Sequence, residues 1–224
     1  MCIRDSIYKD QLLLVNIEGN IGEIKDFFEK MIFPTDNVSL SDNFPIFRLQ
    51  ELDKYQPWRK FEPKIFINKD PKKYCLDNQI ELLKSSDLEM WKIWQAIPRL
   101  NSEIDGENNP LELGLYDLVD FNKGCYLGQE TMARLKRISS LKQEIRVWSS
   151  SILNKNFELN DKKIYLNENK ETITGTITNF LSLSSKKVIG LAMMKKNYLN
   201  QLKYFFNKEL GLIKVEKSIG SAFF

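Results

Sequence analysis

The chain of 224 residues contains no histidine and only three cysteines. Without histidine it cannot form a Ser-His-Asp triad or a Cys-His dyad, and it lacks the side chain that most often binds zinc. Cys75 and Cys125 are fifty residues apart and no Cys-x-x-Cys pair occurs, so a self-contained zinc or iron–sulfur site has no support. Three cysteines also exclude a disulfide framework.

Long apolar runs are missing as well. No segment approaches the roughly 20 apolar residues that a membrane-spanning helix needs. The composition, 42% hydrophobic and 28% charged, is ordinary for a globular fold. We therefore expect a monomeric protein of the cytoplasm with no membrane partner.

The most specific feature of the sequence is the run Lys123-Gly124-Cys125-Tyr126-Leu127-Gly128-Gln129-Glu130. Its two glycines allow backbone conformations that other residues avoid, so a ligand or another chain can approach closely. Lys123 favours the thiolate of Cys125, the form that acts as nucleophile or metal ligand. A short helix predicted over 129–135 would place its N-terminal amides near the thiol and favour the thiolate further. The alternative is a tight turn around a small buried cysteine.

Positive charge is concentrated after this run. Between residues 123 and 146 two acids, Glu130 and Glu144, face six cations: Lys123, Arg134, Lys136, Arg137, Lys142 and Arg146. The segment is either a solvated helix face or an anion site, for the glutamate tail of a folate or for an acidic partner surface. Aromatic residues do not interleave with these cations as a stacking platform requires, so we do not expect nucleic acid.

The first part of the chain has the pattern of a small α/β layer. A strand is predicted over 11–17, and a helix follows because Ile24, Phe27, Phe28, Met31 and Ile32 have helical spacing before Pro34. Short extended runs are predicted over 38–40, 45–50, 64–68 and 72–76. A second helix is expected from Ser86 or Asp87 to Ile97, ended by Pro98. Its Trp91 and Trp94 either pack in the core or form the wall of a ligand pocket.

The last part has the period of strands. They are predicted over 144–150, 162–166, 172–179, 188–194 and 212–215, with 198–206 as a helix or an edge strand. In 172–179 the threonines alternate with Ile173 and Ile177, which predicts one polar and one apolar face. A small antiparallel β-barrel would close such strands, with a domain boundary near residue 141.

The eight-residue run resembles the Lys-Gly-Cys-Tyr-x-Gly-Gln-Glu signature of the YgfZ-type folate-binding proteins. These proteins assist iron–sulfur cluster assembly and are related to the aminomethyltransferase (T-protein) of the glycine cleavage system. Flanking residues resemble the family in the same order: Ile97-Pro98, Glu103-Ile104, Pro110-Leu111-Glu112, Ala133-Arg134, Gly175-Thr176-Ile177-Thr178 and Ile189-Gly190-Leu191-Ala192. The resemblance runs from about residue 8 to the end and is strongest over 88–150.

The resemblance implies an α+β fold. Residues 7–140 would be part of an aminomethyltransferase-like folate-binding domain with a ferredoxin-like α/β layer, and residues 141–224 a C-terminal antiparallel β-barrel. Family members carry several dozen further residues before this region. We therefore expect an N-terminally truncated chain in which residues 1–6 are a foreign leader, and a folate pocket that is incomplete.

The resemblance also implies a folate-binding accessory factor in the assembly or insertion of iron–sulfur clusters, with a link to tRNA modification. The ligands would be tetrahydrofolate or a derivative and a transient cluster, and the partners would be cluster-assembly or client proteins. Cys125, with Lys123, would be the reactive thiol or a ligand of a shared cluster. The rest of the signature loop would comprise Gly124, Tyr126, Gly128, Gln129, Glu130 and Arg134. Two alternatives remain, a folate-dependent aminomethyl or one-carbon transferase and a non-catalytic interaction module.

The residues expected to contact folate are Lys92, Trp94 and Arg134. Lys92 stands where the family often has arginine, which keeps the charge but loses the planar fork. Ala96 stands where the family often has glycine. Trp94 occupies the position of an acid that contacts the folate ring in the aminomethyltransferases, which argues against aminomethyl transfer in their manner.

Overall fold

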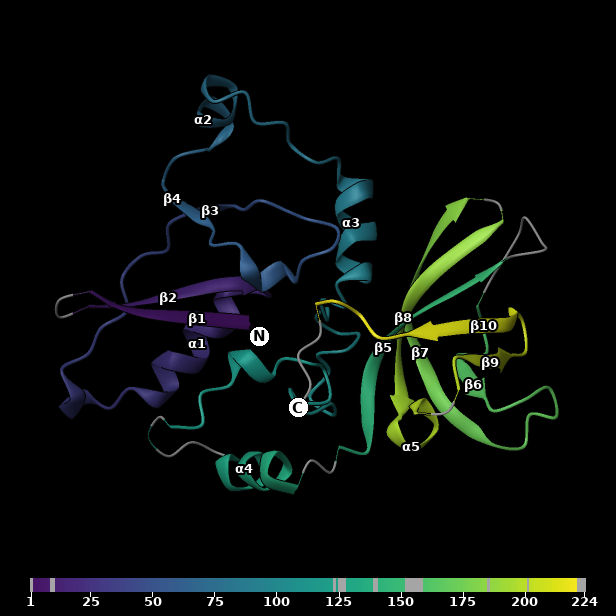
Figure 1. The fold of residues 1–224 in the computed structure, drawn as a ribbon. Helices are drawn as coiled ribbons and strands as arrows, with labels where there is room; N and C mark the ends of the chain where they lie inside the picture. Colours follow the sequence, from purple (N-terminus) through teal and green to yellow (C-terminus); the bar gives the residue numbers. More distant parts are fainter. Residues whose placement is uncertain are drawn as a thin grey trace. The chain divides into compact units, whose positions relative to one another are not determined.

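The computed structural model describes residues 2–8, 11–122, 124, 128–138, 141–151, 159–184, 186–200 and 202–220. The chain forms two compact units (Figure 1). The first comprises Met1–Glu51 and Phe61–Leu82, and the second comprises Leu52–Lys60 and Leu83–Phe224. The predicted boundary near residue 141 falls inside the second unit, and it stays a prediction.

In its described residues the first unit contains two separate two-stranded antiparallel sheets, two α-helices and a 3-10 helix at Pro34–Asp36. Its elements are β1 (Cys2–Tyr8), β2 (Gln11–Glu18), α1 (Ile21–Met31), β3 (Ile46–Leu49), β4 (Lys64–Ile67) and α2 (Lys72–Asp77), where β1 pairs with β2 and β3 with β4. The predicted first strand and first helix are confirmed. The ferredoxin-like layer and the foreign leader, most of which lies in β1, stay predictions.

Two local predictions in this unit need correction. Residues 72–76, predicted to be extended, form the helix α2. The reason is a helix start that periodicity does not reveal: the Asp70 side chain accepts a hydrogen bond from the backbone N–H of Lys72 at 2.9 Å, and Pro71 has φ −71°. Residues 38–40 belong to no strand.

The second unit contains a closed barrel of six antiparallel strands in the order β10-β5-β8-β7-β6-β9. The predicted antiparallel barrel is therefore confirmed. The strands are β5 (Gln143–Ser151), β6 (Lys163–Tyr165), β7 (Ile173–Ser184), β8 (Lys187–Lys195), β9 (Tyr204–Asn207) and β10 (Gly211–Glu216). The α-helices are α3 (Ser85–Trp94), α4 (Gln129–Ile138) and α5 (Lys196–Leu199), and short 3-10 helices occur at Trp58–Lys60 and Tyr116–Leu118. The segment 198–206 contains the end of α5 and most of β9. It is therefore a helix end followed by a strand, and the strand is not the predicted edge strand, because β9 pairs with both β10 and β6.

The barrel is filled by large apolar side chains, among them Trp148, Ile164 and Phe205, each at most 1% exposed. The predicted alternation in β7 is only partly right. Ile177 is buried, but Ile173 is 37% exposed while Thr174 is fully buried and donates to the Ile164 carbonyl at 3.2 Å. A register shift between β6 and β7 at Ile164/Tyr165 explains the reversal, because a shift of one residue exchanges the two faces of a strand.

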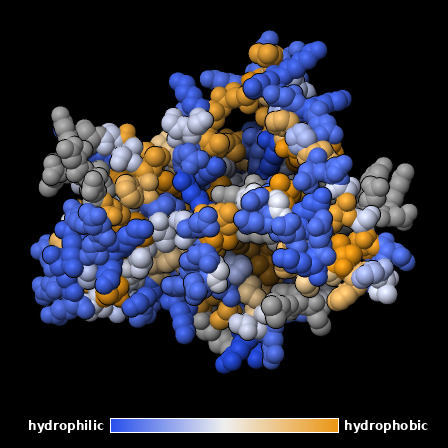
Figure 2. Space-filling model, turned by 180° about the vertical axis from the view of Figure 1, so that it is seen from behind, coloured by the Kyte–Doolittle hydropathy of each residue, from blue (hydrophilic) through white to orange (hydrophobic). Residues whose placement is uncertain are grey.

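A second apolar cluster joins α3 to the outside of the barrel. It contains Ile93 and Ala96 together with β5 and β8 residues such as Ile145 and Leu191, all 3% exposed or less. In the first unit, by contrast, Ile24 and Cys75 are the buried apolar residues among the side chains described. Hydrophobic residues reach the surface between hydrophilic ones (Figure 2), and in the first unit these include Phe27, Met31, Phe33, Phe47, Ile65 and Ile67.

Candidate functional site

The signature run is partly described by the structure. Gly124, Gly128 and the residues of α4 are described, whereas Lys123, Cys125 and Tyr126 lie outside the described residues. Gly128 has φ +84°, a left-handed conformation that favours glycine, and its carbonyl accepts the backbone N–H of Met132 at 3.0 Å. The second glycine of the signature is thus the residue that turns the chain into α4.

An apolar cluster holds the two ends of the signature loop together. Its buried members are Leu111, Met132 and Leu141, and the side chains packed against them come from both sides of the loop: Tyr116, Val119, Phe121 and Leu135. The Nζ of Lys136 in α4 lies over the Tyr116 and Phe121 rings, 5.4 and 4.2 Å from their centroids. The chain that enters the loop and the helix that leaves it therefore share one support, which we call the loop-support cluster.

The residues before the loop are tied down by Arg59. Its guanidinium donates to the Gly114 carbonyl at 2.7 Å and to the Asp117 carboxylate at 3.3 Å, and it lies over the Trp58 ring. Burial lowers the pKa of Arg59 from its ordinary value, and the nearby Asp117 carboxylate opposes that change. Arg59 thus anchors the segment that leads to the signature.

Arg59 belongs to residues 52–60, a segment of the second unit that we call the strap. The strap is bonded to α3 and to the residue after it: the Trp91 indole N–H donates to the Asp53 carbonyl at 3.1 Å, and the Gln95 amide donates to the Gln56 carbonyl at 3.0 Å and accepts the Trp58 N–H at 3.1 Å. Gln95 is only 1% exposed. Its buried amide is thus paired at both ends by the strap.

Helix α4 presents a charged surface. Glu130, Arg134 and Arg137 are exposed, whereas Gln129 is partly buried. Basic residues stand in its last turn, where they interact favourably with the helix dipole. Arg134, predicted to contact folate, is thus solvent-accessible on the helix that follows the signature.

The other two residues expected to contact folate lie on α3. The Lys92 ammonium donates to Glu89 at 2.9 Å, and Arg99 pairs with the same carboxylate. The Lys92 hydrogen bond, with help from the Arg99 charge, lowers the pKa of Glu89 although partial burial opposes it. Trp94 is partly buried and packs against the apolar cluster that joins α3 to the barrel. A folate carboxylate would have to compete with Glu89 for Lys92.

Helix α3 is followed by a left-handed residue, Ala96. Ala96 donates to the Ile93 carbonyl and Ile97 donates to the Lys92 carbonyl, at 2.9 and 3.0 Å, which is a Schellman motif. Ala96 takes the left-handed position of this motif with φ +48°. Glycine is the residue that suits that conformation best, so Ala96 takes it at a conformational cost.

Glu103 was noted in the sequence only as part of the family resemblance. It is fully buried, and its carboxylate accepts hydrogen bonds from four donors: the Arg99 backbone N–H at 2.9 Å, the Ser102 hydroxyl at 3.0 Å, the Asn179 amide at 2.7 Å and the Thr178 hydroxyl. Two of these donors belong to β7. The carboxylate therefore fastens the turn after α3 to the barrel, and no periodicity in the sequence indicates it.

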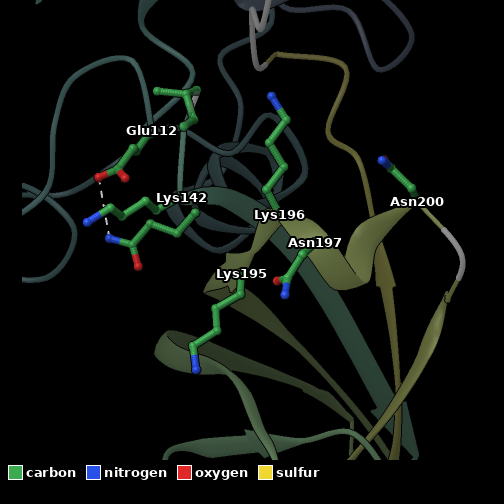
Figure 3. Close-up of a pocket in the computed structure, with 8 residues that line it drawn as sticks. Glu112, Lys142, Lys195, Lys196, Asn197 and Asn200 are labelled. Atoms are coloured by element: carbon green, nitrogen blue, oxygen red, sulfur yellow. Dashed lines mark hydrogen bonds between the residues drawn. The ribbon is translucent and has the colours of Figure 1, made fainter. Parts of the chain in front are cut away.

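An open cleft of about 800 Å³ lies where β5 begins and β8 ends (Figure 3). We call it the lysine cleft, and it is lined by Glu112, Leu141, Lys142, Gln143, Lys195, Lys196, Asn197 and Asn200. The Gln143 side chain donates to Glu112 at 3.4 Å. Of its three lysines, Lys142 belongs to the basic segment seen in the sequence, whereas Lys195 and Lys196 are brought there by the pairing of β8 with β5.

Two features are absent from the residues that the structure describes. None of the helices seen there has the length and apolar character to span a bilayer. Within the same residues, no three cysteine, aspartate or glutamate side chains gather into a metal site.

Comparison with known proteins adds relatives but no family model, since none matches the chain. A chloroplastic protein of Arabidopsis thaliana, named provisionally as a transferase, is 44% identical over 57 residues, which are 25% of this chain and 13% of that protein. An uncharacterized Haemophilus influenzae protein is 28% identical over 167 residues, 70% of this chain and 59% of the relative. The tRNA-modifying protein YgfZ of Vibrio atlanticus is 31% identical over 111 residues, 47% and 34% of the two chains. The chain thus spans less than two thirds of the length of each relative.

Proposed function

The chain is a relative of the YgfZ-type proteins, and from this relationship we propose that it is a folate-binding accessory factor for iron–sulfur proteins. It would assist the assembly or insertion of clusters into client proteins, among them enzymes that modify tRNA. Residues 7–140 would be part of the aminomethyltransferase-like folate-binding domain, and residues 141–224 a separate C-terminal β-barrel domain. The observation that carries the proposal is the complete signature from Lys123 to Glu130.

The loop-support cluster supports a role of the signature loop in binding, because it fixes the residues on either side of the loop. Leu111 and Met132 are 0% and 8% exposed, so the residues that flank the loop are fixed in a packed core. Among the residues that the structure describes, nothing lies within 4 Å of where a Cβ would stand at Gly124 or Gly128, so the backbone at these two glycines is open to close approach.

Cys125 would act as one thiolate ligand of a cluster that is passing between proteins. The chain has no histidine, and Cys75 is 3% exposed on α2 in the first unit. A cluster needs more thiolates than these. The remaining ligands would come from a donor protein, a client or a small thiol, so the cluster is cargo that the protein hands over.

Folate is the second proposed ligand. Arg134 is exposed, and its guanidinium suits the carboxylates of a folate glutamate tail. Lys92 keeps 38% of its side chain exposed while it pairs with Glu89. Trp94 packs against the barrel. It is therefore less suited to contact folate than Lys92 and Arg134, whose positive charges attract an anion.

The proposal is tested by expressing the Cys125→Ala variant in cells from which the gene for this protein has been deleted. We expect Cys125→Ala to leave a cluster-dependent enzyme at the activity of the deletion strain, while a cluster-independent enzyme is unaffected. The matched control is Cys75→Ala, which removes the buried thiol of α2 and should restore activity. Equal protein levels are checked by immunoblotting. Full restoration by Cys125→Ala would show that the thiol has no part in the function.

A folate-dependent one-carbon transferase is the second candidate, favoured by the name of the Arabidopsis relative. It predicts that the purified protein consumes an aminomethyl or methyl donor together with tetrahydrofolate. Folate binding without turnover of either donor would exclude it.

A further inference from the structure

The lysine cleft has no part in the function proposed above. Antiparallel pairing sets Gln143 opposite Lys195, and the backbone N–H of Lys196 donates to the Lys142 carbonyl at 3.0 Å. Three lysines from two segments about fifty residues apart in sequence are therefore held at one rim of the barrel. Positive charges gathered at one rim raise the local potential and attract anions.

The carboxylates at the cleft are already engaged. Glu144, 4% exposed, pairs with Arg146 and with Lys196, the latter at 3.4 Å. Glu112 accepts from Gln143 and from the Asn109 backbone at 3.3 Å. Lys195 donates to the neutral Ile173 carbonyl at 2.8 Å, and in the part of the chain that the structure describes neither Lys142 nor Lys195 forms a salt bridge. The surroundings of the cleft thus carry excess positive charge.

The ammonium groups are spread around the cleft and do not converge. In Figure 3 Lys142 extends toward Glu112, whereas Lys195 and Lys196 point to opposite sides. One compact anion cannot reach all three, but a chain of evenly spaced anions can. Lysine ammonium groups are point charges that contact phosphates without demanding a fixed geometry.

The cleft is also connected to the signature helix. Leu141 lines the cleft and belongs to the loop-support cluster with Met132 of α4. The exposed Arg134 and Arg137 are on that helix. A polyanion in the cleft would lie beside the helix that follows Cys125, and these two arginines could extend the contact.

We infer that the lysine cleft and α4 bind the phosphodiester backbone of RNA. The inference rests on the proposed function for its choice among polyanions, because tRNA-modifying enzymes are among the proposed clients. Aromatic residues between the cations, whose absence argued against nucleic acid in the sequence, are needed to stack bases but not to contact phosphates. Docking on RNA would bring the protein to the substrate on which a client enzyme works.

The test measures binding of an unmodified tRNA transcript by fluorescence anisotropy at several salt concentrations. The double variant Lys142→Gln/Lys195→Gln should weaken binding and lower the slope of log K against log salt by about 1.4 to 1.8, since each phosphate contact contributes about 0.7 to 0.9. Lys196 is kept because it pairs with buried Glu144. The matched control, Lys186→Gln/Lys187→Gln, removes the same charge at the other end of β8 and should change the slope by less than half as much.

Two outcomes would overturn the inference. One is an equal loss of slope in both double variants, which would indicate a general effect of net charge. The other is an oligoglutamate peptide that competes with the transcript at equal charge concentration, which would assign the cleft to carboxylates. Cys125→Ala should bind the transcript normally, so loss of RNA binding and loss of the thiol function are distinguishable. Tryptophan fluorescence of each variant checks that the second unit is folded.

Discussion

Replacing Glu103 should destabilise the second unit strongly. In Glu103→Gln the amide nitrogen takes the place of one carboxylate oxygen, either Oε2, which accepts the Arg99 N–H, or Oε1, which accepts from Ser102, Thr178 and Asn179. Either way at least one buried donor loses its acceptor. A buried donor without an acceptor costs about 1–3 kcal/mol. We therefore expect Glu103→Gln to lower the unfolding free energy of the second unit by about 1–3 kcal/mol.

Glu103→Ala should cost more. The Ser102 and Thr178 hydroxyls can rotate toward other acceptors, but the Arg99 N–H and the Asn179 amide cannot follow. Two stranded donors and the cavity left in a fully buried site give an expected loss of about 3–5 kcal/mol. The exposed Glu107, in the turn that follows, is the matched control, and Glu107→Gln should change stability by less than about 0.5 kcal/mol.

Urea unfolding followed by tryptophan fluorescence measures these differences. All four tryptophans, Trp58, Trp91, Trp94 and Trp148, belong to the second unit, so the signal reports that unit alone. A double-mutant cycle of Glu103→Gln with Asn179→Ala should give a coupling energy of about 1–2 kcal/mol. If Glu103→Gln unfolds at the same urea concentration as Glu107→Gln, the carboxylate does not fasten the turn to the barrel and the reasoning is refuted.

Two further predictions concern the same unit. Gly190→Ala should lower the unfolding free energy by about 1–3 kcal/mol in the same urea assay, because a Cβ there would lie 2.1 Å from the Asn179 carbonyl and 2.7 Å from the Trp148 indole; unchanged stability would contradict this packing. The pKa of Glu89 is lowered by Lys92, so its contribution is present above the ordinary glutamate pKa of about 4.3 and is lost as the pH falls through the lower folded value. Glu89→Gln should therefore lower the unfolding free energy at neutral pH and make it fall less steeply as the pH drops below about 4.3. If the variant loses stability in acid as steeply as the original protein, the ion pair contributes nothing.

Sequence patterns predicted much of the regular structure because the period of apolar residues reports the local backbone conformation, even where the side chains are not buried: Phe27 and Met31 of α1 are 52% and 59% exposed. The stripe of Ile24, Phe27 and Met31 gave α1, and the strand pattern after residue 142 gave the barrel. The prediction of an extended run over 72–76 was wrong because a six-residue helix shows less than two turns of periodicity, and its start depends on the Asp70 side chain. The prediction that Ile173 faces the core and Thr174 the solvent was wrong because a register shift depends on the partner strand.

The candidate site was predicted unevenly for a similar reason. The signature and its helix are contiguous in sequence, so a local motif reveals them. The lysine cleft and the Glu103 network join residues that are about fifty and seventy-five positions apart. Such pairs become neighbours only when β5, β7 and β8 are in register, and no local pattern contains that information.

The strap makes the second unit unsuited to exchange as a gene cassette. The unit is encoded by two stretches, 52–60 and 83–224, separated by residues that belong to the first unit. A recombinant that began at residue 83 would keep Gln95 but lose the Gln56 carbonyl and the Trp58 N–H that pair with its buried amide. Swapping this unit between relatives therefore requires two crossovers that carry the strap along, so the two units are expected to be inherited together.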